Sequence, residues 1–454
     1  MKRLSSYTIC IELKTTNKFM LVHGYTGAID ILDRKIILYL KENEDALSEE
    51  TFPFLDETWK NLQKRGYITS KTKEEEHLFV KKMADLLHRQ NKSFQKHFGF
   101  LVSYNCNFRC PYCYESKISD FGSGWSKRTF NRELIDEVYN AMLLIEPHKQ
   151  LHAKSLLLYG GEPLLKENRE VIKYIVEKGC SLGHTFSTIT NGYDLDSFLD
   201  LLAPDKIASL QITVDGCKET HDRTRIHKDV KSTFDKIVDN IKLALERNIH
   251  VSIRMNCNEK NIAEVNQLKA IFERCGFYNY KGFYFYSALI YDYLQEYKKA
   301  DERANSLKFM ERQNFINKFK EHSNQNFEDE GFERKIKKAI MTGNKILLSP
   351  TYCAAFSSSY LFDPCRNIYS CWETLGDPNT VVGSYDAEKV IFNANLDKLH
   401  SFNVGKSEKC SRCKYVFLCR GGCPVRKNDQ LCAIIPKLFE TSANKAYFDY
   451  MKSI

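Results

Sequence analysis

The sequence predicts an α/β protein built around a parallel sheet, with a small unit of strands and helices before it and a cysteine-rich segment after it. Three observations lead to this prediction. Apolar runs of strand length alternate with amphipathic helical segments from residue 98 to about residue 290. Residues 1–95 show shorter strand and helix patterns. Eight of the 16 cysteines lie between residues 353 and 432.

The first 95 residues predict a winged-helix-like unit. Short apolar alternation from Tyr7 to Val22 predicts strands, and apolar residues at helical spacing predict a helix over residues 28–40. A second helix over residues 52–62 ends near Gly66, a suitable residue to follow a helix. A short strand and a third helix over residues 74–89 lead on to the sheet.

Six strands separated by helices predict a parallel sheet with right-handed crossovers. The predicted strands are Gly99–Tyr104, Ser155–Tyr159, Thr185–Thr190, Ser209–Val214, His250–Met255 and Gly282–Ala288. The predicted helices include Asn131–Ile145, Lys166–Lys178, Ser232–Glu246 and Ile262–Arg274. The sequence alone does not separate an open sheet from a partial barrel. In either fold, the chemistry lies at the carboxyl ends of the strands.

The remainder of the chain carries fewer signals. Residues 300–345 predict one or two charged helices, residues 350–435 an irregular segment, and Lys437–Met451 a final helix. The aromatic-rich stretch Phe277–Tyr293 is expected either in the core around the sixth strand or along a substrate channel.

Composition excludes several classes of protein. The chain has 454 residues, which predicts about three domains, and a mild net charge of +9 that does not demand a nucleic-acid partner. No stretch approaches the roughly 18 apolar residues that span a bilayer. Glu12 interrupts the first apolar run before a signal-peptide core forms. We therefore expect a cytoplasmic protein without a membrane partner.

Sixteen cysteines in a cytoplasmic protein indicate metal binding or catalysis rather than disulfides. Cys106, Cys110 and Cys113 form a tight group directly after the first predicted strand. Three thiolates suit a [4Fe–4S] cluster with one iron open to a small molecule, because closed structural sites have four ligands. The alternative is a zinc site with a distant fourth ligand.

This group resembles the signature of the radical S-adenosylmethionine (SAM) enzymes, C-x-x-x-C-x-aromatic-C. Further matches follow in order, each at the carboxyl end of a predicted strand: G-G-E-P at 160–163, T-N-G at 190–192 and T-V-D-G at 213–216. Each short motif alone is weak, whereas four in order are specific. The resemblance implies a partial (β/α)6 barrel of the TIM type.

The resemblance also implies the SAM contacts. The G-G-E-P turn binds the SAM amino group through backbone carbonyls, which requires the close approach that glycine allows. The T-N-G and T-V-D-G ends contact ribose and methionine, an arginine on the fifth strand holds the carboxylate, and the aromatic residue of the signature lies against adenine. The implied set is Tyr112, Gly160, Gly161, Glu162, Pro163, Asn191, Thr213, Asp215 and Arg254.

In radical SAM enzymes, an electron delivered to the cluster cleaves SAM, and the resulting 5′-deoxyadenosyl radical takes a hydrogen atom from an unactivated C–H bond. The resemblance therefore implies an oxidoreductase with an electron donor such as flavodoxin or ferredoxin. The cofactor supplies this chemistry, and the protein orients it. The sequence assigns no single catalytic side chain.

The second cysteine set has the spacing C-x2-C-x5-C-x3-C from residue 410 to residue 423. Spacing alone also fits a zinc ribbon. After a radical SAM core, the set resembles the SPASM extension, which carries two auxiliary [4Fe–4S] clusters. The resemblance assigns Cys353, Cys371 and Cys423 to the first cluster, and Cys410, Cys413, Cys419 and Cys432 to the second.

Cys365 either completes the first auxiliary cluster, which we favour, or leaves that iron open to substrate. Family members often have glycine five residues before Cys371, where this chain has Arg366. The turn near Cys365 is therefore expected to differ from that of the family.

These assignments divide the chain into five expected segments. They are a leader-peptide recognition module at 1–95, a radical SAM core at 96–300, a helical bridge at 301–349, a SPASM domain at 350–436 and a C-terminal helix at 437–454.

SPASM proteins most often modify peptides or proteins. Anaerobic sulfatase-maturing enzymes typically begin close to their cluster motif and place an aspartate after an auxiliary-cluster cysteine, whereas this chain has about 95 preceding residues and Trp372 after Cys371. Maturases of ribosomally made peptides fit better, because they commonly add a leader peptide to a sheet edge of an N-terminal winged-helix unit. An unrelated N-terminal packing domain is the alternative.

The expected partner is a precursor peptide with a leader, and the expected product is a thioether. Carbon–carbon cross-linking or epimerisation would need the same parts, and formylglycine formation in a sulfatase is the alternative activity. A non-catalytic, zinc-stabilised peptide binder is the hypothesis from another class.

Overall fold

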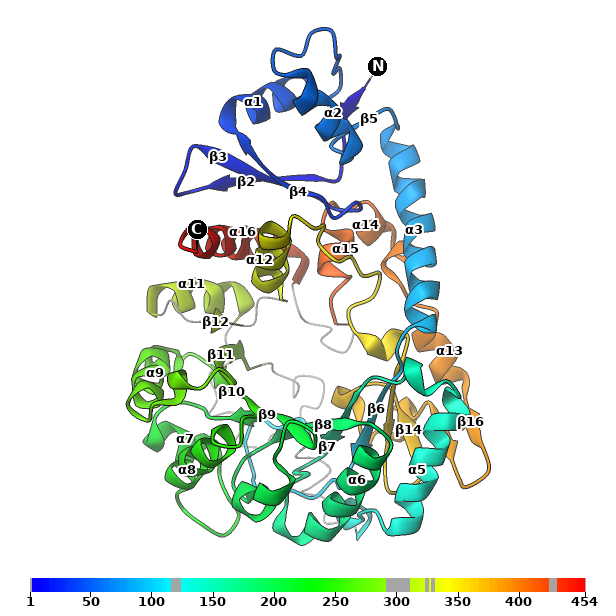
Figure 1. Cartoon of the computed structure of the whole chain (residues 1–454), viewed down its shortest axis with the longest axis vertical. Helices are drawn as coiled ribbons and strands as arrows, with labels where there is room; N and C mark the ends of the chain where they lie inside the picture. Colours follow the sequence, from blue (N-terminus) through cyan, green and yellow to red (C-terminus); the bar gives the residue numbers. More distant parts are fainter. Residues whose placement is uncertain are drawn as a thin grey trace. The chain divides into compact units, whose positions relative to one another are not determined.

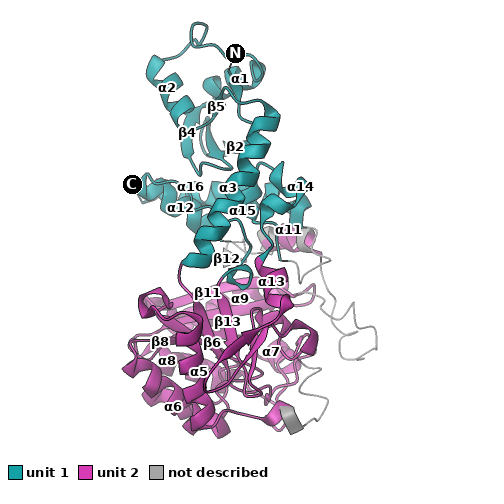
Figure 2. Cartoon of the chain, turned by 90° about the vertical axis from the view of Figure 1, so that its right-hand side faces the viewer, with its two compact units in different colours: residues 1–93, 329–357, 401–454 teal, residues 94–328, 358–400 magenta. Residues whose placement is uncertain are grey.

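The computed structural model describes residues 2–115, 124–290, 311–322, 326–327, 331–423 and 431–453 (Figure 1). The chain divides into two compact units (Figure 2). Unit 1 holds residues 1–93, 329–357 and 401–454, and unit 2 holds residues 94–328 and 358–400. Both ends of the chain therefore belong to one unit, and the predicted sheet belongs to the other.

Unit 2 is built on one large sheet in which the six predicted strands run parallel in sequence order. They are β6 (His97–Leu101), β7 (Ser155–Tyr159), β8 (Thr185–Thr190), β9 (Ile207–Thr213), β10 (His250–Cys257) and β11 (Phe283–Leu289). The predicted α/β class with a parallel sheet is confirmed, and β7 and β8 have the predicted bounds.

The sheet continues on both sides of this set. β12 (Asn326–Phe327) lies parallel beside β11, and β13 (Ser359–Phe362) lies parallel beside β6. β14 (Asn367–Tyr369), β15 (Gly383–Tyr385) and β16 (Val390–Phe392) then add in antiparallel order. These strands show that the expectation of an irregular segment over residues 350–435 is wrong here. The sequence did not reveal them, because strands of three or four residues are too short to show a clear period.

Helices connect the strands of unit 2 where the sequence predicts them. They are α5 (Arg132–Ile145), α6 (Arg169–Ser181), α8 (Phe234–Leu245) and α9 (Val265–Arg274). The seven-residue helix α7 (Lys218–Thr224) is an addition, and α11 (Arg312–His322) and α13 (Ala394–His400) occur later in the chain. The side chain of Asn131 accepts a hydrogen bond from the amide of Leu134 and so fixes the start of α5.

The aromatic stretch that begins at Phe277 contributes to the core. Phe277 and Phe285 are buried, and both rings contact Phe272 on α9. The last three residues of the stretch, 291–293, lie outside the described residues.

The N-terminal part of unit 1, residues 2–93, is here called the N-terminal module. Its antiparallel sheet consists of β2 (Thr8–Leu13), β3 (Lys18–His23) and β4 (Ile29–Asp33), and β1 (Arg3–Leu4) pairs with β5 (Ile68–Thr69). Its helices are α1 (Arg34–Glu42), α2 (Asp56–Lys64) and α3 (Lys73–Ser93). Trp59 and Leu62 of α2 are buried in the core beneath the sheet.

The predicted helix over residues 28–40 is wrong in its first half. Residues 29–33 form β4, and the helix begins only at Arg34. The apolar spacing from Ile29 to Ile36 fits a helix, but pairing with β3 satisfies the backbone of residues 29–33 in the sheet.

The remainder of unit 1 consists of residues 329–357 and 401–454, which pack with the N-terminal module. It contains α12 (Phe332–Thr342), α14 (Glu408–Ser411), α15 (Val416–Cys419) and α16 (Leu431–Met451). The described part of α16 begins six residues before the predicted final helix and includes Cys432.

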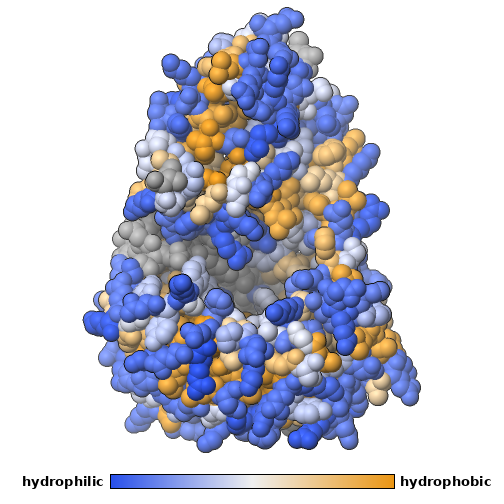
Figure 3. Space-filling view, viewed as in Figure 1, coloured by the Kyte–Doolittle hydropathy of each residue, from blue (hydrophilic) through white to orange (hydrophobic). Residues whose placement is uncertain are grey.

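Among the described residues, no helix is long and apolar enough to cross a membrane. On the face shown in Figure 3, hydrophilic residues cover most of the surface and hydrophobic residues form separate patches, one of them over the N-terminal module in the upper part of the view.

Candidate active site at the carboxyl ends of the strands

The three-cysteine group lies in the loop that follows β6. The amide of Phe108 donates to Cys106 Sγ at 3.3 Å, and the amide of Cys113 donates to the carbonyl of Cys110 at 3.0 Å. The guanidinium of Arg109 donates to the carbonyl of Cys106 at 2.8 Å. Local hydrogen bonds therefore fold this loop around its own sulfur atoms.

The three thiols lie close enough to interact. Burial raises the pKa of Cys106, and the charges of Glu162, Cys110 and Cys113 raise it further. Burial, Glu115 and Cys110 raise the pKa of Cys113 to about 12. A cationic iron–sulfur cluster would remove this repulsion and hold the thiols as thiolates. The donor set therefore fits a cluster.

Single-ion chemistry does not fit the described residues equally well. No three His, Cys, Asp or Glu side chains in the described ranges are arranged to hold one metal ion. A cluster spaces its thiolates around a cube, so three cysteines can suit a cluster without converging on a single point.

The glycine pair after β7 contacts the segment that leads to Cys106. Gly160 has a φ of 139°, and a Cβ atom on it would lie 2.2 Å from the carbonyl oxygen of Ser103. A Cβ atom on Gly161 would lie 2.5 Å from the carbonyl oxygens of Tyr104 and Asn105. The Gly161 amide donates to the Ser103 carbonyl at 3.0 Å. Only glycine permits this backbone contact at both positions.

Glu162 ties the end of β7 to the end of β8. Its carboxylate accepts hydrogen bonds from Thr190 Oγ1 at 2.6 Å, the Asn191 amide at 2.6 Å and the Leu164 amide at 2.9 Å. Burial raises the pKa of Glu162 to about 7, although these hydrogen bonds act in the opposite direction. In this structure the side chain of Glu162 therefore organises the strand ends, and Pro163 beside it is buried.

A second polar cluster joins the cysteine loop to β9 and β10. Tyr112 Oη donates to Asp215 Oδ2, and it accepts from Arg225 at 3.1 Å and from Asn256 at 3.3 Å. Asp215 Oδ1 accepts from the Asn256 amide at 2.9 Å, and Arg254 Nε donates to Asn256 Oδ1 at 2.8 Å. The residues from the predicted SAM-binding set in this cluster thus come from three separate strand ends.

Burial and neighbouring charges shift the pKa values of this cluster in opposite directions. Burial raises the pKa of Asp215, while Arg225 and the hydrogen bonds from Tyr112 and Asn256 lower it. Burial lowers the pKa of Arg225, but the charges of Cys110, Tyr112 and Asp215 outweigh it and raise the pKa overall. The guanidinium is therefore a fixed positive charge beside the cysteine loop.

The remaining members of the predicted SAM-binding set lie at neighbouring strand ends. Asn191 Nδ2 donates to Asn107 Oδ1 at 2.7 Å, which links the end of β8 to the cysteine loop. Thr213 is the last residue of β9, is mostly buried and pairs in register with Arg254. Asn107, Arg225 and Asn256 were not predicted as site residues, because none of them belongs to a recognised motif.

The hairpin of β13 and β14 presents Cys365. Asp363 Oδ1 accepts from the amides of Cys365 and Asn367, at 2.8 Å each, and Asp363 Oδ2 accepts from Tyr104 Oη at 2.9 Å. Tyr104 precedes Cys106 by two residues. A buried carboxylate therefore connects the first cysteine loop to the turn that carries Cys365.

Three aromatic residues lie between the loops of Cys113 and Cys371. Tyr114 Oη hydrogen-bonds to Tyr159 Oη and donates to the carbonyl of Trp372 at 3.3 Å. The indole of Trp372 lies 6.4 Å from the ring of Tyr159, centroid to centroid, and is half-exposed.

The four cysteines predicted for the second auxiliary cluster come together in unit 1. Burial raises the pKa of Cys419 to about 12, and the charges of Cys432, Cys413 and Cys410 contribute to the increase. The Tyr415 amide donates to Cys413 Sγ at 3.4 Å. Cys353 and Cys423 belong to unit 1, and Cys365 and Cys371 belong to unit 2.

Comparison with known proteins identifies the class of enzyme. Residues 100–268 match the family model of the radical SAM superfamily. This range contains the three-cysteine loop, the glycine pair and Asp215. The chain carries a radical SAM domain and is a radical SAM enzyme, and this family implies a [4Fe–4S] cluster and SAM. The hypothesis of a non-catalytic zinc protein is therefore wrong.

The curated relatives include maturation enzymes. The cysteine-type anaerobic sulfatase-maturating enzyme of Clostridium novyi is 23% identical over 373 residues, which cover 76% of this chain and 94% of that relative. The sporulation killing factor maturation protein SkfB of Bacillus subtilis is 29% identical over 171 residues, which cover 37% of each chain.

Solved structures share the fold. Native anSMEcpe with bound AdoMet has a TM-score of 0.53 at 17% identity and covers 76% of this chain and 100% of that one. SuiB of Streptococcus suis has a TM-score of 0.51 at 15% identity and covers 93% of this chain and 96% of that one.

Proposed function

We propose that this radical SAM enzyme modifies a ribosomally synthesised precursor peptide and forms thioether bonds from a cysteine sulfur to a carbon atom of another residue. The observation that carries the proposal is an N-terminal sheet in which β4 is an end strand within the described residues, in a chain that also contains a radical SAM site. Two relatives, which are named as maturation enzymes of a sulfatase and of a killing factor, support a peptide or protein substrate.

In this proposal, Cys106, Cys110 and Cys113 hold the SAM-binding cluster. When bound, the cluster and SAM supply a 5′-deoxyadenosyl radical that removes a hydrogen atom from the substrate. The backbone at Gly160 and Gly161 approaches the cysteine loop closely, and the polar groups of Tyr112, Asp215 and Arg254 orient SAM. The buried strand ends exclude water from the reacting atoms.

The remaining cysteines hold two auxiliary clusters, which brings the total to three. Cys353, Cys371 and Cys423, completed by Cys365, hold the first cluster. Cys410, Cys413, Cys419 and Cys432 hold the second. The substrate thiolate is positioned near an auxiliary cluster, and electrons arrive from a carrier such as flavodoxin or ferredoxin.

The leader peptide adds to the outer edge of β4. At the opposite edge of the sheet, Asn444 on α16 hydrogen-bonds to the backbone of Lys14 at 2.9 Å and of Glu12 at 3.1 Å. β4 is the end strand of the sheet within the described residues. An extended peptide can pair with such an edge through main-chain hydrogen bonds.

A cavity of about 310 Å³ lies between β4 and α2. It offers a pocket for side chains of the added peptide, with the ion pair of Asp30 and Arg65 as its charged part. Its lining residues are Asp30, Leu32, Thr58, Asn61, Leu62, Arg65 and Tyr67.

Formylglycine formation in a sulfatase is the second candidate. The alignment with 94% of the C. novyi enzyme favours it. Trp372 stands after Cys371, however, where such enzymes place an aspartate base, and an indole cannot accept a proton in this way. Carbon–carbon cross-linking uses the same cluster residues and differs only in the bond formed.

The cofactor assignment is tested by replacing Cys106, Cys110 and Cys113 with alanine. We expect 5′-deoxyadenosine formation to fall below detection in the anaerobically reconstituted, reduced enzyme, because the radical source is lost. The auxiliary-cluster absorption should remain. Cleavage of SAM by the triple variant would contradict the assignment.

The peptide-binding assignment is tested with Asn61→Trp, which fills the cavity beside β4. Lys64→Trp on the same helix is the control, because Lys64 does not line the cavity. The neighbouring genes are first searched for a short cysteine-rich reading frame, and the peptide that it encodes, synthesised with a fluorophore, is the probe. We expect at least tenfold weaker binding for Asn61→Trp and none of this loss for Lys64→Trp. Equal affinity of both variants would exclude this edge as the leader site.

A further inference from the structure

The N-terminal module and the C-terminal cysteine segment share one hydrophobic core. Partly buried Cys410, a predicted cluster ligand, packs against this core. The core residues come from the sheet, from α3 and from the segment after residue 400, and are Tyr7, Tyr25, Val80, Ala84, Val404, Val416 and Phe417. The module is therefore folded together with the cysteine segment.

Ser411 makes two buried polar contacts between them. Tyr7 Oη donates to the carbonyl oxygen of Ser411 at 2.6 Å, and a hydrogen bond of 2.9 Å joins His77 Nε2 to Ser411 Oγ. Ser411, Tyr7 and His77 are all buried, with exposed fractions of 0%, 2% and 3%. Water does not reach these buried groups, so loss of the Tyr7 bond removes this donor from the Ser411 carbonyl. Ser411 Oγ also donates to the carbonyls of Ser407 at 2.9 Å and Glu408 at 3.2 Å. Ser411 lies between the predicted ligands Cys410 and Cys413.

The backbone of the module also contacts this loop. A Cβ atom on Gly24 would lie 2.0 Å from the carbonyl oxygen of Lys414, the residue after Cys413. The amide of Gly24 donates to the carbonyl of Tyr7 at 2.9 Å. The turn after β3 is therefore in direct contact with the cysteine loop.

Tyr7 packs against Tyr25, which belongs to a buried polar network around Glu76. Its ring contacts the ring of Tyr25 at 5.2 Å, and Tyr25 Oη donates to Glu76 at 2.9 Å. Glu76 also accepts from Ser5 Oγ at 2.5 Å and pairs with Arg3 at 2.6 Å. These contacts fix Tyr7 relative to α3.

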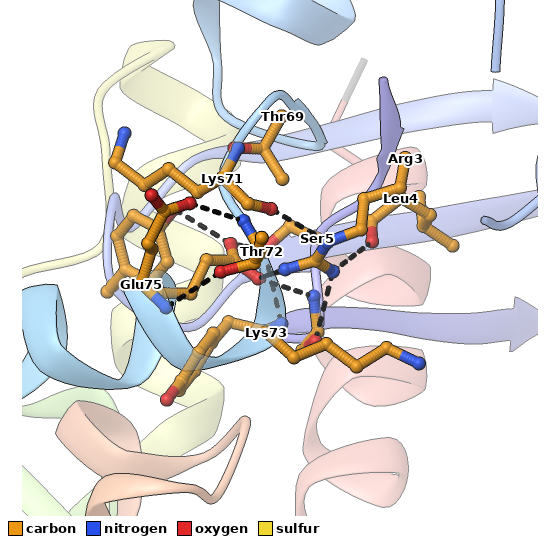
Figure 4. Close-up of polar contacts among 12 residues, drawn as sticks. Arg3, Leu4, Ser5, Thr69, Lys71, Thr72, Lys73 and Glu75 are labelled. Carbon is orange, nitrogen blue, oxygen red and sulfur yellow. Dashed lines mark hydrogen bonds and ion pairs between the residues drawn. The ribbon is translucent and has the colours of Figure 1, made fainter. Parts of the chain in front are cut away.

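The start of α3 is equally well fixed. The Thr72 amide donates to Glu75 at 2.8 Å, and the Glu75 amide donates to Thr72 Oγ1 at 3.2 Å, which forms a capping box. Arg3 Nε donates to the carbonyl of Lys71 at 2.8 Å (Figure 4). Tyr7 and His77 therefore contact Ser411 from a rigid support.

We propose that Tyr7 and His77 are positioning residues for the Cys410–Cys413 loop, so that the N-terminal module fixes the second auxiliary cluster and this cluster in turn stiffens the module. The inference rests on the proposed function, because it requires a cluster on Cys410, Cys413, Cys419 and Cys432. Hydrogen bonds that orient ligand loops tune the affinity and potential of metal centres. The module that binds the peptide thus also controls the environment of a redox centre.

The first test uses the anaerobically reconstituted full chain and the variants Tyr7→Phe, His77→Leu and His77→Gln. Tyr39→Phe is the matched control, because Tyr39 Oη donates to the carbonyl of Thr51 within the module and not to the Cys410–Cys413 loop. Iron release to a chelator and the midpoint potentials of the clusters are measured.

We expect Tyr7→Phe and His77→Leu to release the iron of one cluster about tenfold faster, which corresponds to the loss of one buried hydrogen bond. The potential of that cluster should shift. His77→Gln, which retains a hydrogen-bonding group, should recover much of the difference, and Tyr39→Phe should match the wild type. Release rates and potentials equal to those of the wild type in Tyr7→Phe and His77→Leu would overturn the inference.

The second test measures the effect of the cluster ligands on the N-terminal module. Hydrogen exchange is compared between the wild type and Cys410→Ala/Cys413→Ala. We expect faster exchange around Tyr7 and Gly24 in the variant and unchanged exchange in α5 of unit 2. Unchanged exchange in the module would overturn the inference alone, whereas a wild-type chain without iron on these cysteines would contradict the three clusters of the proposed function.

Discussion

Arg366 keeps a turn for which glycine is better suited. Its φ is 64°, in the left-handed region, and its guanidinium makes two hydrogen bonds with Glu137, of 2.9 and 2.8 Å. The amides on either side of it, those of Cys365 and Asn367, both donate to Asp363. The turn that carries Cys365 therefore has a conformation that glycine adopts readily, although the sequence departs from the family pattern there.

The conformational cost at this residue can be measured. Arg366→Gly relieves the left-handed backbone but loses the partly exposed ion pair, so the two effects oppose each other. Arg366→Ala also loses the ion pair but retains the conformational cost of the left-handed backbone. We expect the alanine variant to be about 1 kcal/mol less stable than the glycine variant by thermal unfolding of the apo chain. Equal stability would mean that φ is not constrained there.

At the scale of elements, the contact between the β7 turn and the segment after β6 positions the whole site. Gly160 and Gly161 lie within van der Waals contact of the backbone that leads to Cys106. An added methyl group must push this backbone away, because the nearest atoms are carbonyl oxygens and not flexible side chains.

We expect Gly161→Ala to reduce 5′-deoxyadenosine formation at least 100-fold, because the cysteine loop and the turn can no longer meet. Gly183→Ala is the control for backbone strain away from the cysteine loop, since φ is 89° there and a Cβ atom meets nothing within 4 Å. Product is quantified by chromatography at matched iron content. Wild-type activity of Gly161→Ala would show that this close approach is not required.

The elements themselves were predictable where period and length agree. β7 and β8 are short apolar runs bounded by turns, and their bounds match. Residues 28–40 were mispredicted because Ile29 and Leu32 fit a helix and a strand equally well, and only pairing with β3 decides between them. β13–β16 are too short to show a period.

The site was predictable only where motifs exist. The cysteines and the strand-end glycines follow recognisable spacings. Arg225 and Asn256 reach Tyr112 from distant positions in the chain, and no local pattern marks them. The contact of Tyr7 with Ser411 spans 404 positions and follows from tertiary packing alone.

At the scale of the molecule, each unit contains a buried neutral histidine. Burial lowers the pKa of His23 in unit 1 to about 4 and the pKa of His221 in unit 2 to about 3. His23 Nδ1 accepts from the Thr26 amide, and His221 Nδ1 accepts from the Asp215 amide, so both rings serve as acceptors. Both folds therefore favour the neutral ring.

Acid should destabilise both units through these rings. Because the unfolded chain binds a proton near pH 6.5 and the folded chain does not, stability is lost as pH falls from about 6.5 toward the folded values. At pH 5 this linkage lowers the free energy of unfolding by about 2 kcal/mol for each ring. We expect His221→Gln and His23→Gln to lose less stability between pH 7 and pH 5 than the wild type in urea unfolding. Parallel losses would contradict the linkage.

The position of β13 beside β6 has a consequence for biosynthesis. A ribosome completes β6 to β11 long before β13 emerges, so the outer edge of β6 stays unpaired while most of the protein is being translated. An open strand edge invites association with other nascent polypeptides. The rate of translation after β11, or a chaperone that shields this edge, should therefore affect the yield of folded enzyme in a recombinant host.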